Sequence, residues 1–168
     1  MYYYAAILEI GDGVAVNKTE AVKYYKMAAD KGHVKAMHNY AVCLDNGTGV
    51  AVNKTEAAKY YKMAADKGHV NAMYFYANRI DYGIGLPVNK PEAAKYYKMA
   101  ADEGHAKAMY YYAATLENGD GVPVNKTEAA KYYKMAADKG YEMAMNSYGV
   151  CLEKGIGVAV NKTEAVKY

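Results

Sequence analysis

The sequence predicts an all-α fold, an α-α superhelix (solenoid) of tandem 36-residue helix-turn-helix repeats. An Asn-Lys pair recurs at positions 17, 53, 89, 125 and 161, always at that spacing. Each complete copy is followed by an amphipathic helical pattern of nearly constant sequence, and a Gly-x-Gly segment stands shortly before each. A unit of this length cannot bury its apolar face alone, so successive units must stack on one another.

The period divides the chain into a single array of complete and partial units. The complete units are 17–52, 53–88, 89–124 and 125–160, and the partial units are 1–16 and 161–168. Residues 1–16 match 109–124, so Met1 occupies the place of a repeat methionine. Solenoids normally have polar capping repeats at their ends, and neither end of the chain carries one. We therefore expect the array to be a fragment of a longer protein.

The second helix of each unit, helix B, is predicted at about 18–31, 54–67, 90–103 and 126–139. Asn17 is a favourable N-cap, and Glu20 stands three residues later, which is the spacing of a capping box. Gly32 and its copies supply the left-handed residue that ends the helix. The apolar stripe of helix B consists of Ala21, Tyr24, Tyr25, Ala28 and Ala29.

The first helix, helix A, is predicted at about 34–46, 70–82, 106–118 and 142–154. Its apolar stripe follows spacings of three and four residues and consists of Ala36, Met37, Tyr40, Ala41 and Leu44. Alanines let the helices approach closely while tyrosine rings fill the remaining space, which accounts for 21 tyrosines in a chain without tryptophan.

These residues resemble the Sel-one-like repeat, a subfamily of the tetratricopeptide-type helical repeats. The resemblance covers essentially the whole chain, although asparagine replaces the more usual aspartate cap. It implies a right-handed superhelix that serves as an adaptor, in which helix A lines the concave face, and members are also found fused to enzymes such as protein kinases. In one unit the matching residues are Ala108, Ala113, Gly119, Gly121, Val122, Asn125, Ala129, Tyr132, Tyr133, Ala136, Ala137 and Gly140.

Composition argues against a nucleic-acid or membrane partner. The net charge is only +3, and lysines alternate with acids along helix B, as on a solvated helix surface. No run approaches the ~18 apolar residues needed for a membrane span, and no signal sequence is visible. Cys43 and Cys151 lie three repeats apart, too far to pair, which fits a reducing compartment. We therefore expect a cytoplasmic protein without membrane insertion.

The sequence shows no equipment for catalysis or cofactor binding. The Gly-x-Gly segments lack the third glycine and the preceding strand of a phosphate loop, so they are interpreted as connections between helices. A histidine stands four residues before a methionine in three units, as in His33 and Met37, but that methionine belongs to the core stripe. Ser147 is the only serine and lacks an acid-histidine partner. We expect no enzyme activity, catalytic residue, metal, cofactor or small-molecule substrate.

Helix B is nearly constant between units, whereas helix A varies at positions 38, 39, 42, 43 and 46 and their copies. These positions are expected to form one stripe away from the core, and in the resembling family helix A lines the groove. The sequence thus favours a scaffold that binds a protein or peptide in this groove. Repeats within a larger fused enzyme, or a single-strand RNA reader, are the alternatives. The predicted partner-binding residues are Asn39, Tyr74, Phe75, Asn78, Arg79, Tyr82, Tyr110, Tyr111, Asn118 and Asn146.

Overall fold

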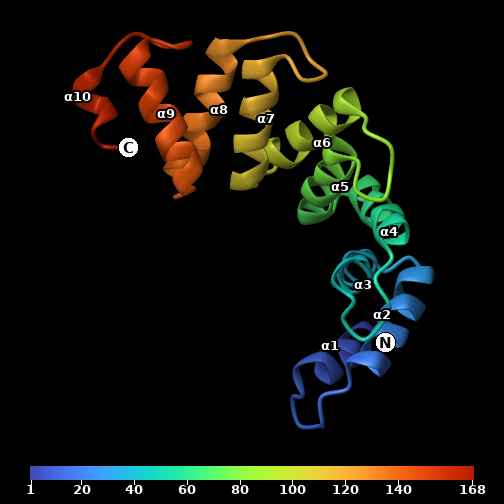
Figure 1. Cartoon of the computed structure of the whole chain (residues 1–168). Coiled ribbons are helices and arrows are strands. Elements are labelled where there is room, and N and C mark those ends of the chain that lie inside the picture. The colour runs from blue at the N-terminus through green and yellow to red at the C-terminus, as the bar shows by residue number, and fades with distance from the viewer. The chain divides into compact units, whose positions relative to one another are not determined.

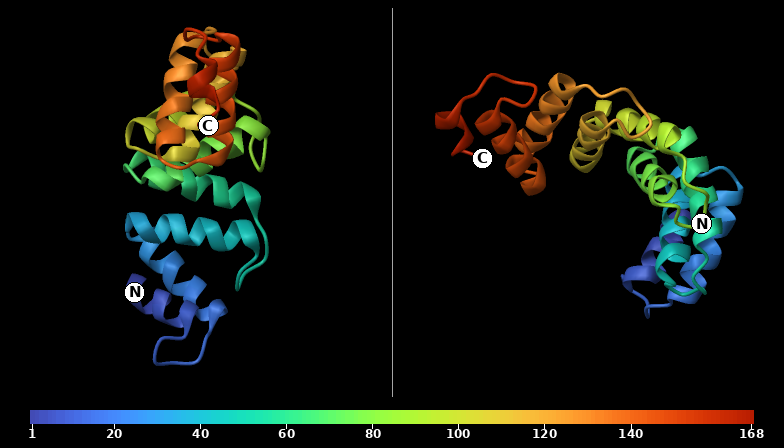
Figure 2. Two further views of the ribbon diagram at one scale, coloured as in Figure 1. Left: turned by 90° about the vertical axis from the view of Figure 1, so that its left-hand side faces the viewer. Right: turned by 45° about the horizontal axis from the view of Figure 1, so that its top comes forward.

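The computed structural model describes residues 1–168 and contains ten helices and no strands (Figure 1). Two compact blocks can be distinguished, an N-terminal block, Met1–Val88, and a C-terminal block, Asn89–Tyr168. Within each block every helix packs mainly on the helices before and after it in the chain. Two further views show this alternation of helix and connection in each block (Figure 2). The predicted all-α fold of stacked helix pairs is confirmed.

Helices of type A and type B alternate throughout the chain. The N-terminal block contains α1 (Tyr2–Ile10), α2 (Lys18–Asp30), α3 (Val34–Asn46), α4 (Lys54–Asp66) and α5 (Val70–Tyr82). The C-terminal block contains α6 (Lys90–Asp102), α7 (Ala106–Asn118), α8 (Lys126–Asp138), α9 (Glu142–Lys154) and α10 (Lys162–Ala165). Odd numbers are A helices and even numbers are B helices, and each complete B helix ends one residue earlier than predicted.

The B helices begin at the predicted asparagine caps. In α8 the Glu128 amide donates to Asn125 Oδ1 at 3.0 Å, and Asn125 Nδ2 donates to Glu128 Oε2 at 3.2 Å. The glutamate therefore bonds the asparagine side chain, whereas in a standard capping box it bonds the backbone amide of the cap residue. The Asn125 amide donates instead to the Leu116 carbonyl at 2.8 Å, which ties the cap to the preceding helix.

Three A helices begin at a histidine, a cap that the sequence reasoning did not assign. The Nδ1 atoms of His33, His69 and His105 accept hydrogen bonds from backbone amides three residues later, at 3.1 to 3.2 Å. Tyr141 stands at the same place before α9 and makes no side-chain cap. Asparagine and histidine thus mark the starts of B and A helices in turn.

The two predicted apolar stripes form most of the core. All five stripe residues of α3 are buried, and in α2 only Tyr24 of the five is half-buried. The expectation that the whole variable side of helix A lies away from the core is wrong at one position. Cys43 and its copies Thr115 and Cys151 are buried, and the Arg79 side chain is only 12% exposed. At this position the Arg79 side chain reaches Asp45, an acid of the preceding A helix.

In four of the five Gly-x-Gly segments, the second glycine lets the connection after an A helix approach the start of the preceding B helix closely. Gly49 has φ +70, and a Cβ atom placed on it would lie 2.3 Å from the Lys18 carbonyl oxygen at the start of α2. The same contact recurs at Gly121, where a Cβ atom would lie 2.3 Å from the Lys90 carbonyl carbon. These segments therefore join helices, as predicted, and four of them also pack against the start of the preceding B helix. None of the helices combines the length and the apolar character that crossing a membrane requires.

Candidate functional site

The predicted partner-binding residues divide between the two blocks and differ in exposure. Tyr82 is exposed over 57% of its surface, and Asn118 and Asn146 are also exposed. The other seven are half-buried: Asn39, Tyr74, Phe75, Asn78, Arg79, Tyr110 and Tyr111. The three exposed side chains present more of their surface to solvent than the seven half-buried ones do.

In the N-terminal block the aromatic rings pack against one another across α3, α4 and α5. Phe75 stacks on Tyr61 with ring centroids 5.2 Å apart, and Tyr74 meets Phe75 edge-on at 5.3 Å. His38 stacks on His69 at 4.5 Å and lies 5.7 Å from Phe75. Each such pair adds about 0.5 to 1.5 kcal/mol beyond simple burial. Phe75 therefore contributes to repeat packing as well as to the surface.

Burial controls the protonation of this cluster. It lowers the pKa of His38 to about 4, and the neighbouring His69 adds to the effect. Burial also raises the pKa of Tyr61, with a further contribution from the Asp45 carboxylate. Both side chains are thus neutral near pH 7 and suited to an apolar interior.

In the C-terminal block the corresponding tyrosines make the same kind of contact. Tyr110 and Tyr111 lie edge-on with ring centroids 5.4 Å apart, and Tyr111 stacks on Tyr97 at 5.4 Å. Tyr110 also contacts Tyr133 in α8 at 5.6 Å and Tyr141 at the start of α9 at 5.4 Å. These rings join consecutive helices while leaving part of each ring open to a partner.

Arg79 is paired with an acid of its own chain, Asp45. Its guanidinium donates to the Asp45 carboxylate and, at 3.1 Å, to Asn78 Oδ1. Lys54 Nζ donates to Asp45 Oδ1 at 3.0 Å and to the Asp45 carbonyl at 2.5 Å. The Asp45 side chain is 7% exposed, so this is a nearly buried ion cluster linking α3, α4 and α5. Sequence reasoning assigned Arg79 to partner binding and did not find its internal acid.

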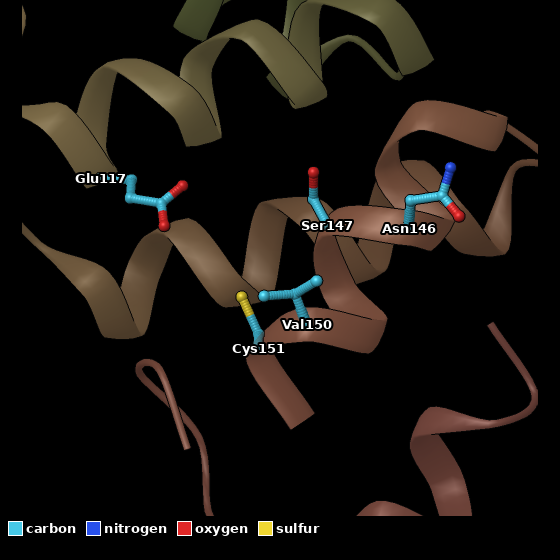
Figure 3. A pocket seen from close by; sticks show the side chains of 5 residues that line it. All are labelled: Glu117, Asn146, Ser147, Val150 and Cys151. Atoms are coloured by element: carbon cyan, nitrogen blue, oxygen red, sulfur yellow. The ribbon is translucent and has the colours of Figure 1, made fainter. Parts of the chain in front are cut away.

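The C-terminal block contains a cavity of about 280 Å³ between the end of α7 and α9. Its lining residues are Glu117, Asn146, Ser147, Val150 and Cys151. In Figure 3 the Glu117 carboxylate turns toward α9, which carries the other four residues. Of the five, only Asn146 was predicted as a partner-binding residue. Of the other four, Ser147 was weighed as a lone serine and Cys151 as a distant cysteine, while Glu117 and Val150 were assigned to no site, and only the grouping of all five reveals one.

The cavity has one anionic wall and otherwise neutral walls. Glu117 Oε2 accepts a hydrogen bond from the Tyr133 hydroxyl at 2.8 Å, and Glu117 makes no ion pair. Burial, together with the Glu117 charge, raises the pKa of the Cys151 thiol to about 11. The thiol is therefore protonated near pH 7, which makes it a poor nucleophile. Nowhere in the chain do three or more His, Cys, Asp or Glu side chains gather in an arrangement suited to a metal ion.

The profile of the Sel1 repeat family matches five consecutive segments, 1–33, 34–69, 70–105, 106–141 and 142–168, which together span the whole chain. The chain belongs to the Sel1 repeat family. Sel1 repeat proteins are generally non-catalytic helical scaffolds for protein interaction. From residue 34 on, each matched segment begins at or beside the start of an A helix and ends in the turn after a B helix or at the chain end.

Solved Sel1 repeat structures have the same fold. A Sel1 repeat protein from Oxalobacter formigenes is 30% identical, with a TM-score of 0.94 over 99% of this chain and 68% of that one. The protective antigen c5321 of uropathogenic Escherichia coli, which displays an SLR fold, is 28% identical, with a TM-score of 0.93 over 98% and 35%. Cysteine rich protein B of Helicobacter pylori shares the fold at 22% identity, with a TM-score of 0.59 over 77% and 92%. No curated protein sequence matches the chain.

Proposed function

We propose that this Sel1 repeat chain is a non-catalytic scaffold that binds a protein partner, as a peptide or a folded domain, through the exposed side of its A helices. The observation that carries the proposal is the contrast between the two helix types. The B helices α4 and α8 have the same sequence, KTEAAKYYKMAAD, whereas the A helices change from repeat to repeat.

The last residue of each A helix shows the contrast most clearly. All five residues at this position are exposed, and they are Ile10, Asn46, Tyr82, Asn118 and Lys154. Each residue ends a helix of the same kind and precedes a glycine, so the backbone does not require their side chains to differ. Different side chains on a constant frame provide selective contacts for a partner. Tyrosine is moreover among the residue types that dominate the binding energy of protein interfaces.

Affinity capture with the purified chain, followed by binding measurements on the isolated partner, tests the proposal. The double variant Tyr82→Ala with Asn118→Ala should weaken binding by about tenfold or more, since a central tyrosine contributes about 2 kcal/mol. A matched control is Lys59→Ala with Lys131→Ala, because both lysines are exposed and lie on B helices. A partner that responds to the lysine variant and not to the A-helix variant would contradict the proposal.

A further inference from the structure

The cavity in the C-terminal block occupies the place of a filled site in the N-terminal block. Two repeats separate the corresponding residues, so Glu117 corresponds to Asp45 and Cys151 to Arg79. In the same way Ser147 corresponds to Phe75. The two sites have the same framework, and they differ in the side chains that α5 and α9 supply.

In the N-terminal block the chain fills the site itself. Arg79 reaches back from α5 to the carboxylate of Asp45 at the end of α3, with 12% of its side chain exposed. Phe75, one turn earlier, stacks on Tyr61 at the position that Ser147 has in the C-terminal block. A guanidinium beside a carboxylate, with an aromatic ring next to it, is a favourable arrangement for an arginine side chain.

In the C-terminal block both filling side chains are replaced by small ones. Ser147 and Cys151 leave the cavity of about 280 Å³, and the acid remains at its wall as Glu117. Tyr133, the counterpart of Tyr61, holds one carboxylate oxygen at 2.8 Å. Lys54 pairs with Asp45, but its counterpart Lys126 makes no ion pair with Glu117. Glu117 is thus an acid without a cation at a position where its counterpart has two.

We propose that this cavity receives an arginine side chain from the protein partner, with its guanidinium against the Glu117 carboxylate. The inference deepens the proposed function and rests on it. The arginine stem packs against Val150, and the Ser147 hydroxyl offers a further acceptor on α9 (Figure 3). Arginine has five planar N–H donors, so it uses several acceptors at once better than lysine does.

The occupant comes from outside these 168 residues. Arg79 is the only arginine among them, and it is already bound to Asp45, so a second copy of this segment has none to offer. The cavity is also at the lower limit of the roughly 300 to 1,000 Å³ typical of pockets for whole small-molecule ligands. A single inserted side chain of a larger partner suits this volume better than a cofactor does.

Three synthetic pentapeptides test the inference on the full chain: acetyl-Gly-Ala-Arg-Ala-Gly-amide and its citrulline and lysine counterparts. Citrulline has nearly the shape of arginine without its charge. Amide and methyl chemical shifts of the labelled protein should move at Ser147, Val150 and Cys151 with the arginine peptide. We expect the citrulline peptide to bind about tenfold more weakly or worse, since a charge-assisted hydrogen bond is lost.

Three variants locate the binding. Glu117→Gln should weaken binding of the arginine peptide to the level of the citrulline peptide. Glu142 is an exposed acid on α9 outside the cavity, so Glu142→Gln should leave binding unchanged. Cys151→Arg should fill the cavity as Arg79 fills its counterpart and abolish peptide binding, with helical content and cooperative unfolding retained.

Equal binding of all three peptides, or arginine binding that survives Glu117→Gln, would overturn the inference. Equal binding of free N-acetylarginine amide and the pentapeptide would also overturn it, because a small guanidinium compound would then be the natural occupant. The proposed scaffold function fails in a different experiment, in which the A-helix variant of Tyr82 and Asn118 retains its captured partner.

Discussion

Arg79 reaches back 34 residues along the chain to the buried carboxylate of Asp45. The contact joins two A helices of successive repeats and leaves Asp45 only 7% exposed. Lys54 completes the cluster from the intervening B helix. Charges thus reinforce a repeat interface that is otherwise built from alanine and aromatic side chains.

Replacing Arg79 should destabilise the N-terminal block. Arg79→Ala leaves Asp45 buried with only the lysine as a partner, and we expect a loss of about 2 to 4 kcal/mol in the free energy of unfolding, measured by urea titration. Lys98→Ala is the control, because it removes a half-exposed ion pair with Asp102 and should cost less than about 1 kcal/mol. Equal losses in the two variants would show that the Arg79 pair is no more than a surface contact.

Acid should destabilise the protein through His38. The pKa of this histidine falls from 6.5 to about 4 on folding, so between these values the unfolded chain binds a proton that the folded chain does not. Stability is therefore present above pH 6.5 and is lost as the pH drops toward 4, by no more than about 3 kcal/mol. His38 Nδ1 is buried without a hydrogen-bond partner, so an N–H group formed there on protonation would find no acceptor.

The His38→Tyr variant isolates this effect from the titration of carboxylates. Tyrosine occupies the corresponding position at Tyr74 and Tyr110, so the substitution is compatible with the repeat. Urea titrations at several pH values should show a smaller decline between pH 6.5 and 4 for the variant than for the parent chain. Parallel curves would mean that His38 does not carry the acid sensitivity.

Gly49 should tolerate a side chain far less well than Gly13. Both have φ near +70, so Gly49→Ala and Gly13→Ala share the left-handed strain of about 1 to 2 kcal/mol. At Gly49 the new Cβ atom would also lie 2.3 Å from the Lys18 carbonyl oxygen, whereas at Gly13 nothing lies within 4 Å. Thermal melts should show a clearly larger loss for Gly49→Ala. Similar melting temperatures would mean that the loop around Gly49 shifts freely and is not packed tightly against the start of α2.

Removing one asparagine cap should cost about 1 kcal/mol. Asn125→Ala deletes both hydrogen bonds with Glu128 at the start of α8. Asn125→Asp keeps an acceptor for the Glu128 amide and should recover most of the loss, as in family members with an aspartate cap. Urea titration of the two variants gives the comparison, and an aspartate variant no better than alanine would mean that Asn125 Nδ2 is the important group.

The fold could be predicted because its determinants are local and repeated. Asn17 with Glu20, and the stripe of Ala36, Met37, Tyr40, Ala41 and Leu44, carry their signal within one helix. The candidate site could not, since it depends on pairs 34 residues apart, such as Arg79 with Asp45 and Cys151 with Glu117. Helical periodicity places Cys43 and Cys151 away from their own helix pair, but it does not show that each lies near an acid of the preceding A helix, Glu9 or Glu117. Pairs of residues 34 positions apart, two fewer than the 36-residue period, would have indicated these contacts between repeats.

The bond from Asp30 to the following B helix has a consequence for how the array can change in length. Tyr60 donates to Asp30 at 2.7 Å and Tyr132 donates to Asp102 at 2.9 Å, so the same junction occurs in both blocks. Because each B helix carries both halves of this junction, any repeat can follow any other. A duplication or deletion of 36 residues would therefore recreate a standard junction, and the number of repeats is free to vary during evolution without redesign of the core.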